Sequence, residues 1–170
     1  MPIRSAVQLA ALLLLAVPAA ACYESTQPVG PMAASTIDSA FVGTWTCVDP
    51  KDAANRATLI SRCLNAHQYE VEWREPGDHV TRYHVHATVL GAERLFNVQE
   101  IDTAHPKTSF GFVRARLDAS RQLTMAIVEA DAVKPKTGAD AIRTIRARVG
   151  DPTLYGPFAT CTAQPAPEAK

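Results

Sequence analysis

The segment from residue 68 to residue 89 has the pattern of two β-strands joined by a tight turn. In each half, apolar residues alternate with polar ones, as in strands with one buried face. The apolar positions are Tyr69, Val71 and Trp73 in the first half, and Tyr83, Val85, Ala87 and Val89 in the second. Between them, Glu75-Pro76-Gly77-Asp78 is typical of a turn. Pairing Trp73 with Thr81 keeps the apolar faces together. The same register forms two favourable polar pairs, Glu72 with Arg82 and Glu70 with His84.

Short strands continue on both sides of this hairpin. They are predicted at residues 42–48, 57–63, 95–101, 108–117, 122–129 and 158–162. In the hairpin around residues 118–120, Val113, Ala115 and Leu117 are expected to face Ile127, Met125 and Leu123. The predicted fold class is all-β: an up-and-down antiparallel barrel of about eight strands over residues 41–163, with a disordered tail at 164–170.

One helix is predicted before the last strand. Thr137 is a suitable N-cap, and Asp140 follows three residues later as in a capping box. The apolar stripe consists of Ile142, Ile145 and Val149. The residues expected to lie toward solvent are Arg143, Arg146 and Arg148. A solvated helix face is the simpler interpretation of these arginines, and recognition of an acidic partner is the alternative.

The N-terminal region has the three parts of an export signal. Arg4 is followed by an apolar stretch at residues 6–17, which is shorter than a membrane-spanning helix needs. The run Ala19-Ala20-Ala21-Cys22 resembles a bacterial lipobox, after which the cysteine is the acylated N-terminus of the mature protein. We therefore expect a signal peptide at residues 1–21, lipidation at Cys22 and a flexible tether up to residue 40.

The location follows from this interpretation. An acylated Cys22 followed by Tyr23 favours the outer membrane of a bacterial cell envelope, with the protein facing the periplasm. Cleavage by ordinary signal peptidase would instead leave a soluble periplasmic or secreted protein. The 17 basic and 17 acidic residues balance, which excludes the basic footprint of a nucleic-acid-binding protein.

The cysteines indicate an oxidising compartment. If Cys22 carries lipid, Cys47, Cys63 and Cys161 remain, and any single pairing leaves one thiol free. Cys47–Cys161 is favoured because the first and last strands of a closed barrel are neighbours. Cys47–Cys63, across a shorter loop, is the alternative. No pair has the C-x-x-C spacing of a zinc site.

The run Gly43-Thr44-Trp45 matches the G-x-W signature of lipocalins, at the start of the first predicted barrel strand. The chain thus resembles a lipocalin-like, or calycin-like, barrel. It also resembles uncharacterised bacterial lipoproteins with a G-x-W-x-C start and a cysteine in the last strand. The lipocalin resemblance implies that Trp45 plugs the closed end of the barrel and that the interior holds a small ligand.

Two functions are compatible with an exported barrel of this kind. In the first, a barrel holds a small apolar ligand or lipid. The residues expected to contact it are Trp45, Tyr69, Trp73, Tyr83, Phe96 and Met125. In the second, a solid barrel acts as an interaction or inhibitor protein for an envelope partner, through residues 49–56 or 135–137.

The sequence contains no recognised catalytic signature. We therefore expect no enzyme activity, no cofactor and no metal site. His84 and His86, two positions apart on one strand, have the spacing of some zinc ligands, but a polar surface ladder is the favoured interpretation. Glu70 and Glu72 share that face beside arginine and histidine, which does not favour an acid/base pair.

Overall fold

A computed structural model describes residues 22–101, 108–134 and 137–165. Its barrel strands are β2 (Gly43–Asp49), β3 (Asp52–Cys63), β4 (Tyr69–Arg74), β5 (Val80–Leu90), β6 (Glu93–Glu100), β7 (Phe110–Leu117), β8 (Gln122–Val128) and β9 (Tyr155–Ala163). A short strand, β1 (Glu24–Ser25), precedes them. The helices are α1 (Ala130–Val133) and α2 (Gly138–Ala147), with the 3₁₀ turns η1 (Met32–Ala34), η2 (Ser39–Phe41) and η3 (Pro152–Leu154).

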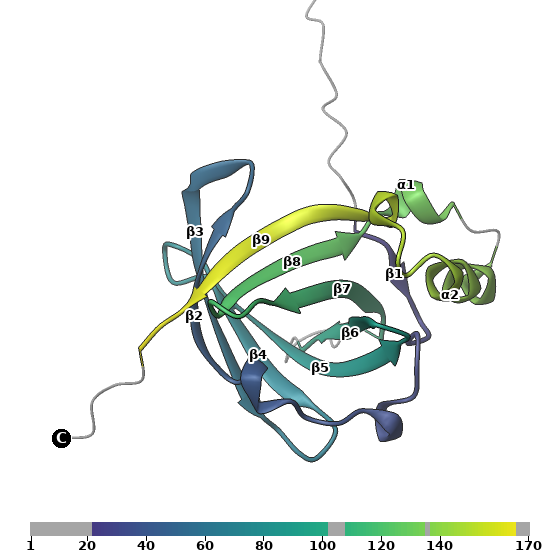
Figure 1. The fold of residues 1–170 in the computed structure, drawn as a ribbon, viewed down its shortest axis with the longest axis horizontal. Helices are drawn as coiled ribbons and strands as arrows, with labels where there is room; N and C mark the ends of the chain where they lie inside the picture. Colours follow the sequence, from purple (N-terminus) through teal and green to yellow (C-terminus); the bar gives the residue numbers. More distant parts are fainter. Residues whose placement is uncertain (1–21, 102–107, 135–136, 166–170) are drawn as a thin grey trace, which may run out of the picture.

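Within the described residues, β2 to β9 form a closed barrel of eight antiparallel strands (Figure 1). Each strand pairs with the next along the chain from β2 to β8, and β9 lies between β8 and β2 to close the ring. This confirms the predicted fold class, including the helix before the last strand. The closed antiparallel barrel is consistent with a lipocalin-like fold.

The predicted strand registers are confirmed. In the β4–β5 pair Trp73 lies opposite Thr81 and Glu72 opposite Arg82. In the β7–β8 pair Val113 lies opposite Ile127. Both registers follow from matching apolar faces, because a shift of one residue would turn every inward side chain to the outside.

The two ends of the barrel differ in their connections. Short turns join β3 to β4, β5 to β6 and β7 to β8 at one end, which we call the closed end. At the opposite end, which we call the mouth, residues 129–154 carry α1, α2 and η3 between β8 and β9. Trp45 is fully buried near the closed end, where β2 begins and β9 ends, and the Arg121 guanidinium lies 5.9 Å from its ring centroid. Phe41 of η2 packs against the same core.

The N-terminal segment, residues 22–41, is not a flexible tether, and that prediction was wrong. It begins at the mouth, where β1 pairs with β7, and crosses the outer face of β6 and β5 to reach the closed end. Val29 is buried and its N–H donates to Oδ1 of Asn97 at 2.7 Å. Gly30 lies so close to β5 that an added Cβ would be 2.6 Å from the Thr88 side chain. The segment docks because polar side chains on the outer face satisfy its backbone groups.

The helical region lies outside the barrel beside β1 (Figure 1). Thr137 caps α2 as predicted, with its Oγ1 accepting from the Asp140 N–H at 3.1 Å. Ile145 is fully buried in a second core that includes Val29 and Phe112. Val149, predicted as part of the apolar stripe, lies beyond the end of the helix. No helix among the residues described here is long and apolar enough to cross a bilayer.

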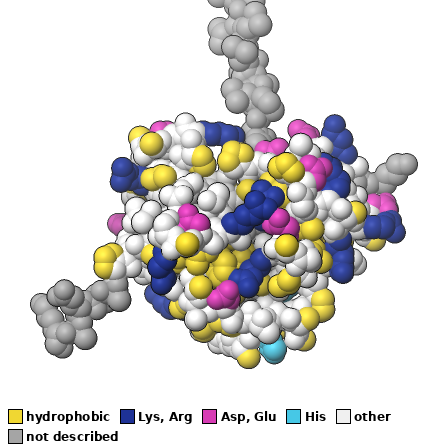
Figure 2. Space-filling model, viewed as in Figure 1, with side chains coloured by type: hydrophobic (Ala, Val, Ile, Leu, Met, Phe, Trp, Pro, Cys, Tyr) yellow, Lys and Arg dark blue, Asp and Glu magenta, His cyan; other side chains and the backbone are white. Residues whose placement is uncertain are grey.

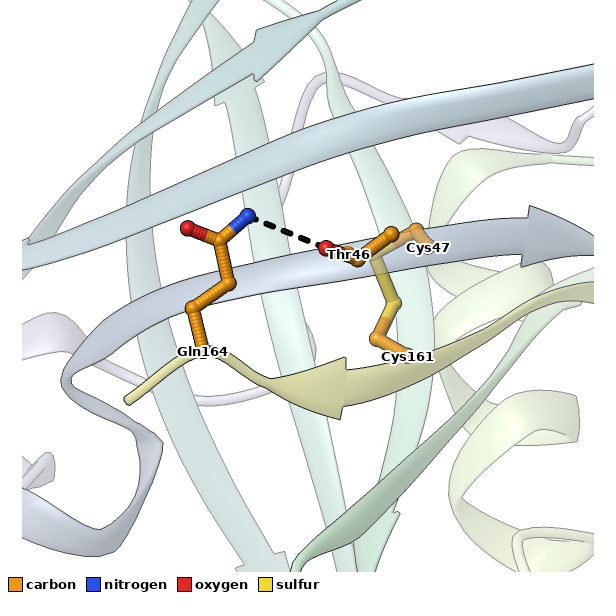
Figure 3. Close-up of a disulfide and its surroundings, with 4 residues drawn as sticks. All are labelled: Thr46, Cys47, Cys161 and Gln164. Atoms are coloured by element: carbon orange, nitrogen blue, oxygen red, sulfur yellow. Dashed lines mark hydrogen bonds between the residues drawn. A yellow bond between two sulfur atoms is a disulfide. The ribbon is translucent and has the colours of Figure 1, made fainter. Parts of the chain in front are cut away.

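A disulfide joins the first and last barrel strands (Figure 3). Cys47 of β2 and Cys161 of β9 lie directly opposite each other, and both are fully buried. Beside them, Nε2 of Gln164 donates to Oγ1 of Thr46 at 3.0 Å (Figure 3). The favoured pairing is confirmed, and the Cys47–Cys63 alternative is wrong because Cys63 is an exposed free thiol at the closed end.

Replacing both Cys47 and Cys161 with alanine should lower the free energy of unfolding by about 4 to 5 kcal/mol, because the bond closes a long loop with a sequence separation of 114. Urea denaturation under non-oxidising and oxidising conditions would measure the change. Cys63→Ser is the matched control and should stay within about 0.5 kcal/mol of the wild type, since this thiol is exposed. Equal urea midpoints for the double variant and the control would contradict the structural role of the bond.

Candidate ligand-binding cavity

The barrel encloses a cavity of about 300 Å³. Its walls are mainly aliphatic and aromatic side chains that point inward from β3 to β9. Five of the six residues predicted to contact a ligand line it: Tyr69, Trp73, Tyr83, Phe96 and Met125. Trp45 does not, because it is packed in the core near the closed end. The alternation of inward and outward side chains explains why sequence reasoning found most of the wall.

The floor of the cavity is an aromatic cluster near the closed end. The Phe96 ring lies edge-on to Phe41 and Tyr69, with centroids 5.2 and 6.0 Å away. The Tyr69 hydroxyl accepts from the Asp38 N–H at 2.7 Å, and Asp38 also pairs with Arg94 at 2.6 Å. Burial raises the pKa of Tyr69, so its hydroxyl stays protonated at neutral pH. These contacts hold η2 against the closed end of the barrel. Tyr69 thus both lines the cavity and fixes η2 through its hydroxyl.

The mouth of the cavity carries the polar groups. Glu24, Glu100 and Ser109 line it, and the Ser109 hydroxyl donates to Glu24 at 2.7 Å. On another part of the rim the Trp73 and Phe158 rings lie 5.2 Å apart, and Phe158 is partly exposed. The cavity is therefore apolar in depth and polar at one side of its entrance.

Two mouth residues, Cys22 and Glu24, were not predicted to line the cavity. Strand β1 is only two residues long and its neighbours are rich in proline and serine, so no periodic signal marks it. The side chain between them, Tyr23, stacks on Phe112 outside the barrel at 6.3 Å. Burial raises the pKa of the Cys22 thiol, with smaller contributions of the same sign from Glu24 and Glu129.

Of the two histidines on β5 that were predicted to lie on the surface, one is buried. His86 is buried, and its Nε2 lies 3.0 Å from the Gly30 carbonyl oxygen. The Phe110 ring packs edge-on to it at 5.9 Å. Burial lowers the pKa of His86. His84 remains partly exposed. His86 is buried because the N-terminal segment covers it. The alternation within β5 cannot predict this contact with a distant segment.

Glu72 lies at the centre of an ion cluster on the outer face of β3, β4 and β5. It is buried, and its carboxylate lies 2.6 Å from Arg74 and 3.1 Å from Arg62, with Arg82 at 3.7 Å. Hydrogen bonds from Arg74 and then from Arg62 lower the pKa of Glu72. Such a carboxylate stays ionised, whereas a general acid needs a raised pKa.

The arginines after Thr137 were predicted to form a solvated helix face, but their side chains differ in their contacts. Arg146 donates to the Val29 carbonyl at 3.0 Å, which ties α2 to the N-terminal segment. Arg148 donates to the Ala132 carbonyl at 2.7 Å and to Asp151. Arg143, which pairs with Asp140, and Arg146 are exposed, whereas Arg148 is half-buried. Arg146 and Arg148 therefore support the fold through bonds to backbone carbonyls, and Arg146 also stays accessible to solvent.

Among the described residues, no group of three or more histidine, cysteine, aspartate or glutamate side chains is placed to hold a metal ion. Of the region 135–137 proposed for partner contacts, residues 135 and 136 lie outside the described residues. Comparisons with models of protein families, with curated proteins and with solved structures find no match. The cavity itself is thus the observation from which a function can be argued.

Stability should depend on pH through His86. Its pKa is lowered in the folded protein, so below about pH 6.5 the unfolded chain binds a proton that the folded chain resists. The free energy of unfolding should therefore fall as the pH falls from 7.5 to 5.5, and this fall should be smaller in His86→Gln. Urea denaturation at both pH values tests this. His84→Gln, on the same strand, is the matched control and should keep the wild-type dependence; the same dependence in His86→Gln would contradict the assignment.

Proposed function

We propose that the protein is an exported, lipid-anchored envelope protein that binds a small apolar or amphipathic molecule inside its barrel. The cavity of about 300 Å³, walled by apolar side chains, is the observation that carries this proposal. Its volume lies at the lower end of the usual range for ligand sites, which favours one slender molecule. Burial of an apolar chain in such a space contributes about 25 cal/mol per Å² removed from water.

The layout of the walls suggests how such a ligand would lie. An apolar tail would occupy the depth between Val98, Met125 and the aromatic floor. A polar head would remain at the mouth, within reach of Glu24 and Ser109. A single-chain lipid has this chemistry.

The second candidate function, a solid barrel acting on an envelope partner, is less well supported. It requires a filled interior, whereas this barrel encloses an apolar cavity. The loop proposed for contacts does project from the barrel as the tip of the β2–β3 hairpin (Figure 1), and residues 50–56 are exposed. Such a projection could serve a binding protein as well as an inhibitor.

Membrane attachment would come from lipid on Cys22 and not from surface charge. Basic and acidic side chains are intermixed on the face in Figure 2, in keeping with the balanced charges of the chain. Acylation would join Cys22 Sγ to a diacylglyceryl carbon of a phospholipid, whose phosphate headgroup leaves and takes up the thiol proton. Hydrolysis of the Ala21–Cys22 peptide bond would then produce the mature N-terminus. Several acyl chains give effectively permanent attachment at about 0.8 kcal/mol per buried methylene.

Filling the cavity should abolish ligand binding. Met125→Trp places a larger side chain in the lumen and should weaken the binding of the fluorescent probe N-phenyl-1-naphthylamine by about ten-fold or more, since a ligand must fit the enclosed volume. Thr124→Trp, the adjacent exposed position on β8, is the matched control and should leave probe binding unchanged.

Circular dichroism of both variants separates loss of the cavity from loss of the fold. Ile127→Trp, which also lines the lumen, provides a second test if Met125→Trp does not fold. Equal probe binding by a folded lumen variant and by Thr124→Trp would refute the cavity as the binding site.

Replacing Cys22 with alanine should release the protein from the membrane fraction and remove the mass of the lipid. Mass spectrometry of the intact chain and membrane fractionation measure the two effects. Cys63→Ser is the matched control, because this thiol is at the opposite end of the barrel and should be irrelevant to attachment. A Cys22→Ala protein that stays in the membrane fraction would disprove the anchor.

A further inference from the structure

We infer that the mouth of the barrel rests directly on the membrane, so that the cavity opens onto the lipid surface. This inference rests on the anchor at Cys22 in the proposed function. It adds the orientation of the barrel relative to the membrane. The flexible tether expected from the sequence would have allowed every orientation, whereas the docked N-terminal segment does not. The proposed surface is the rim formed by Cys22, Trp73, Val80 and Phe158.

Cys22 is held at the mouth by contacts on both sides. It forms a β-bridge with Glu129, and the N–H of the following Tyr23 donates to the Val128 carbonyl at 3.0 Å. Two residues further on, Glu24 pairs with Gly111 of β7. Acyl chains attached at Cys22 would therefore start at the rim of the cavity, with no length of free chain between lipid and barrel.

The alternation along this strand also gives the direction in which the anchor leaves the protein. Cys22 and Glu24 line the cavity, whereas Tyr23 between them packs outside the barrel on Phe112. Because side chains alternate across a strand, the Cys22 side chain lies on the lumen side of the rim. A lipid attached there can enter a bilayer only if the mouth is turned toward that bilayer.

Part of the rest of the rim is apolar, whereas the exposed tip of the β2–β3 hairpin at the same end is polar. Val80 and Phe158 are 42% and 37% exposed at the same end as Trp73, which lies opposite Thr81 next to the β4–β5 turn. Exposed apolar residues also occur at the closed end, where Leu64 is 41% exposed. Apolar exposure alone thus does not choose between the ends, and the position of Cys22 decides it.

This orientation has a consequence for ligand uptake. A lipid leaving the membrane could enter the cavity without crossing water. Crossing water would be unfavourable because it exposes the apolar chain of the lipid. The ligand class that fits is then a single-chain lipid from that membrane.

Spin labels at the two ends of the barrel test the orientation. The acylated full-length mature protein would be reconstituted into vesicles of phosphatidylethanolamine and phosphatidylglycerol. One sample carries a nitroxide on the native Cys63, at the closed end. The other carries it at position 79, as His79→Cys in a Cys63→Ser background, on the β4–β5 turn at the mouth, where the His79 side chain is 69% exposed.

We expect the label at position 79 to collide several-fold more often with oxygen, which concentrates in the bilayer, than with an aqueous nickel chelate, and the label on Cys63 to show the reverse. Equal access of the chelate to both labels on vesicle-bound protein would overturn the mouth-down orientation while leaving the anchor intact. Protein that does not float with vesicles would overturn the anchor and this inference together, whereas probe binding by the unacylated chain would still stand.

A linker variant tests whether the orientation matters for uptake. Insertion of 12 glycine and serine residues between Cys22 and Tyr23 keeps the anchor and the Tyr23 contacts but allows a separation of about 20 Å. We expect flotation to be unchanged and the label at position 79 to become accessible to the chelate. Transfer of a pyrene-labelled lysolipid from the vesicle to the barrel should be several-fold slower. An equally long insertion after Ala66, in the exposed β3–β4 turn at the closed end, is the matched control and should leave flotation, chelate access and transfer as in the wild type. Transfer at the wild-type rate in the Cys22–Tyr23 linker variant would overturn direct uptake at the mouth.

Discussion

The pairing of β9 with both β8 and β2 is the interaction on which the rest of the structure depends. It joins the last barrel strand to the first, so that within the described part of the chain each strand from β2 to β9 is paired on both sides. The buried Cys47–Cys161 bond lies inside this contact. Only after closure do the inward side chains of strands that are distant in the sequence, such as Trp73 and Phe158, face one another across a common lumen.

The N-terminal segment determines what lies at each end of that lumen. At the mouth it holds Cys22, and at the closed end it places Phe41 against the aromatic floor. Between these points it is held by buried hydrogen bonds to Asn97 and His86 on the outer face. One segment thus couples the entrance of the cavity, its floor and the site proposed for the lipid anchor.

Sequence reasoning found the features that depend on neighbouring residues. The register of the β4–β5 hairpin and the Thr137 cap were both predicted, because each follows from a local pattern of side chains. It failed where a distant segment covers a position that alternation assigns to solvent. His86 is the clear example, since the N-terminal segment buries it and the Gly30 carbonyl oxygen contacts its Nε2.

The amino-acid sequence by itself determined the all-β class, the inward face of each strand and most of the cavity wall. It could do so because the alternation of apolar and polar residues is a property of each strand alone. Only the tertiary structure decided that the barrel is hollow, that Trp45 lies outside the cavity wall and that Cys22 lies at the mouth. These depend on how closely side chains from all strands fill the lumen and on where the N-terminal segment docks, and both are sums over contacts between residues far apart in the chain.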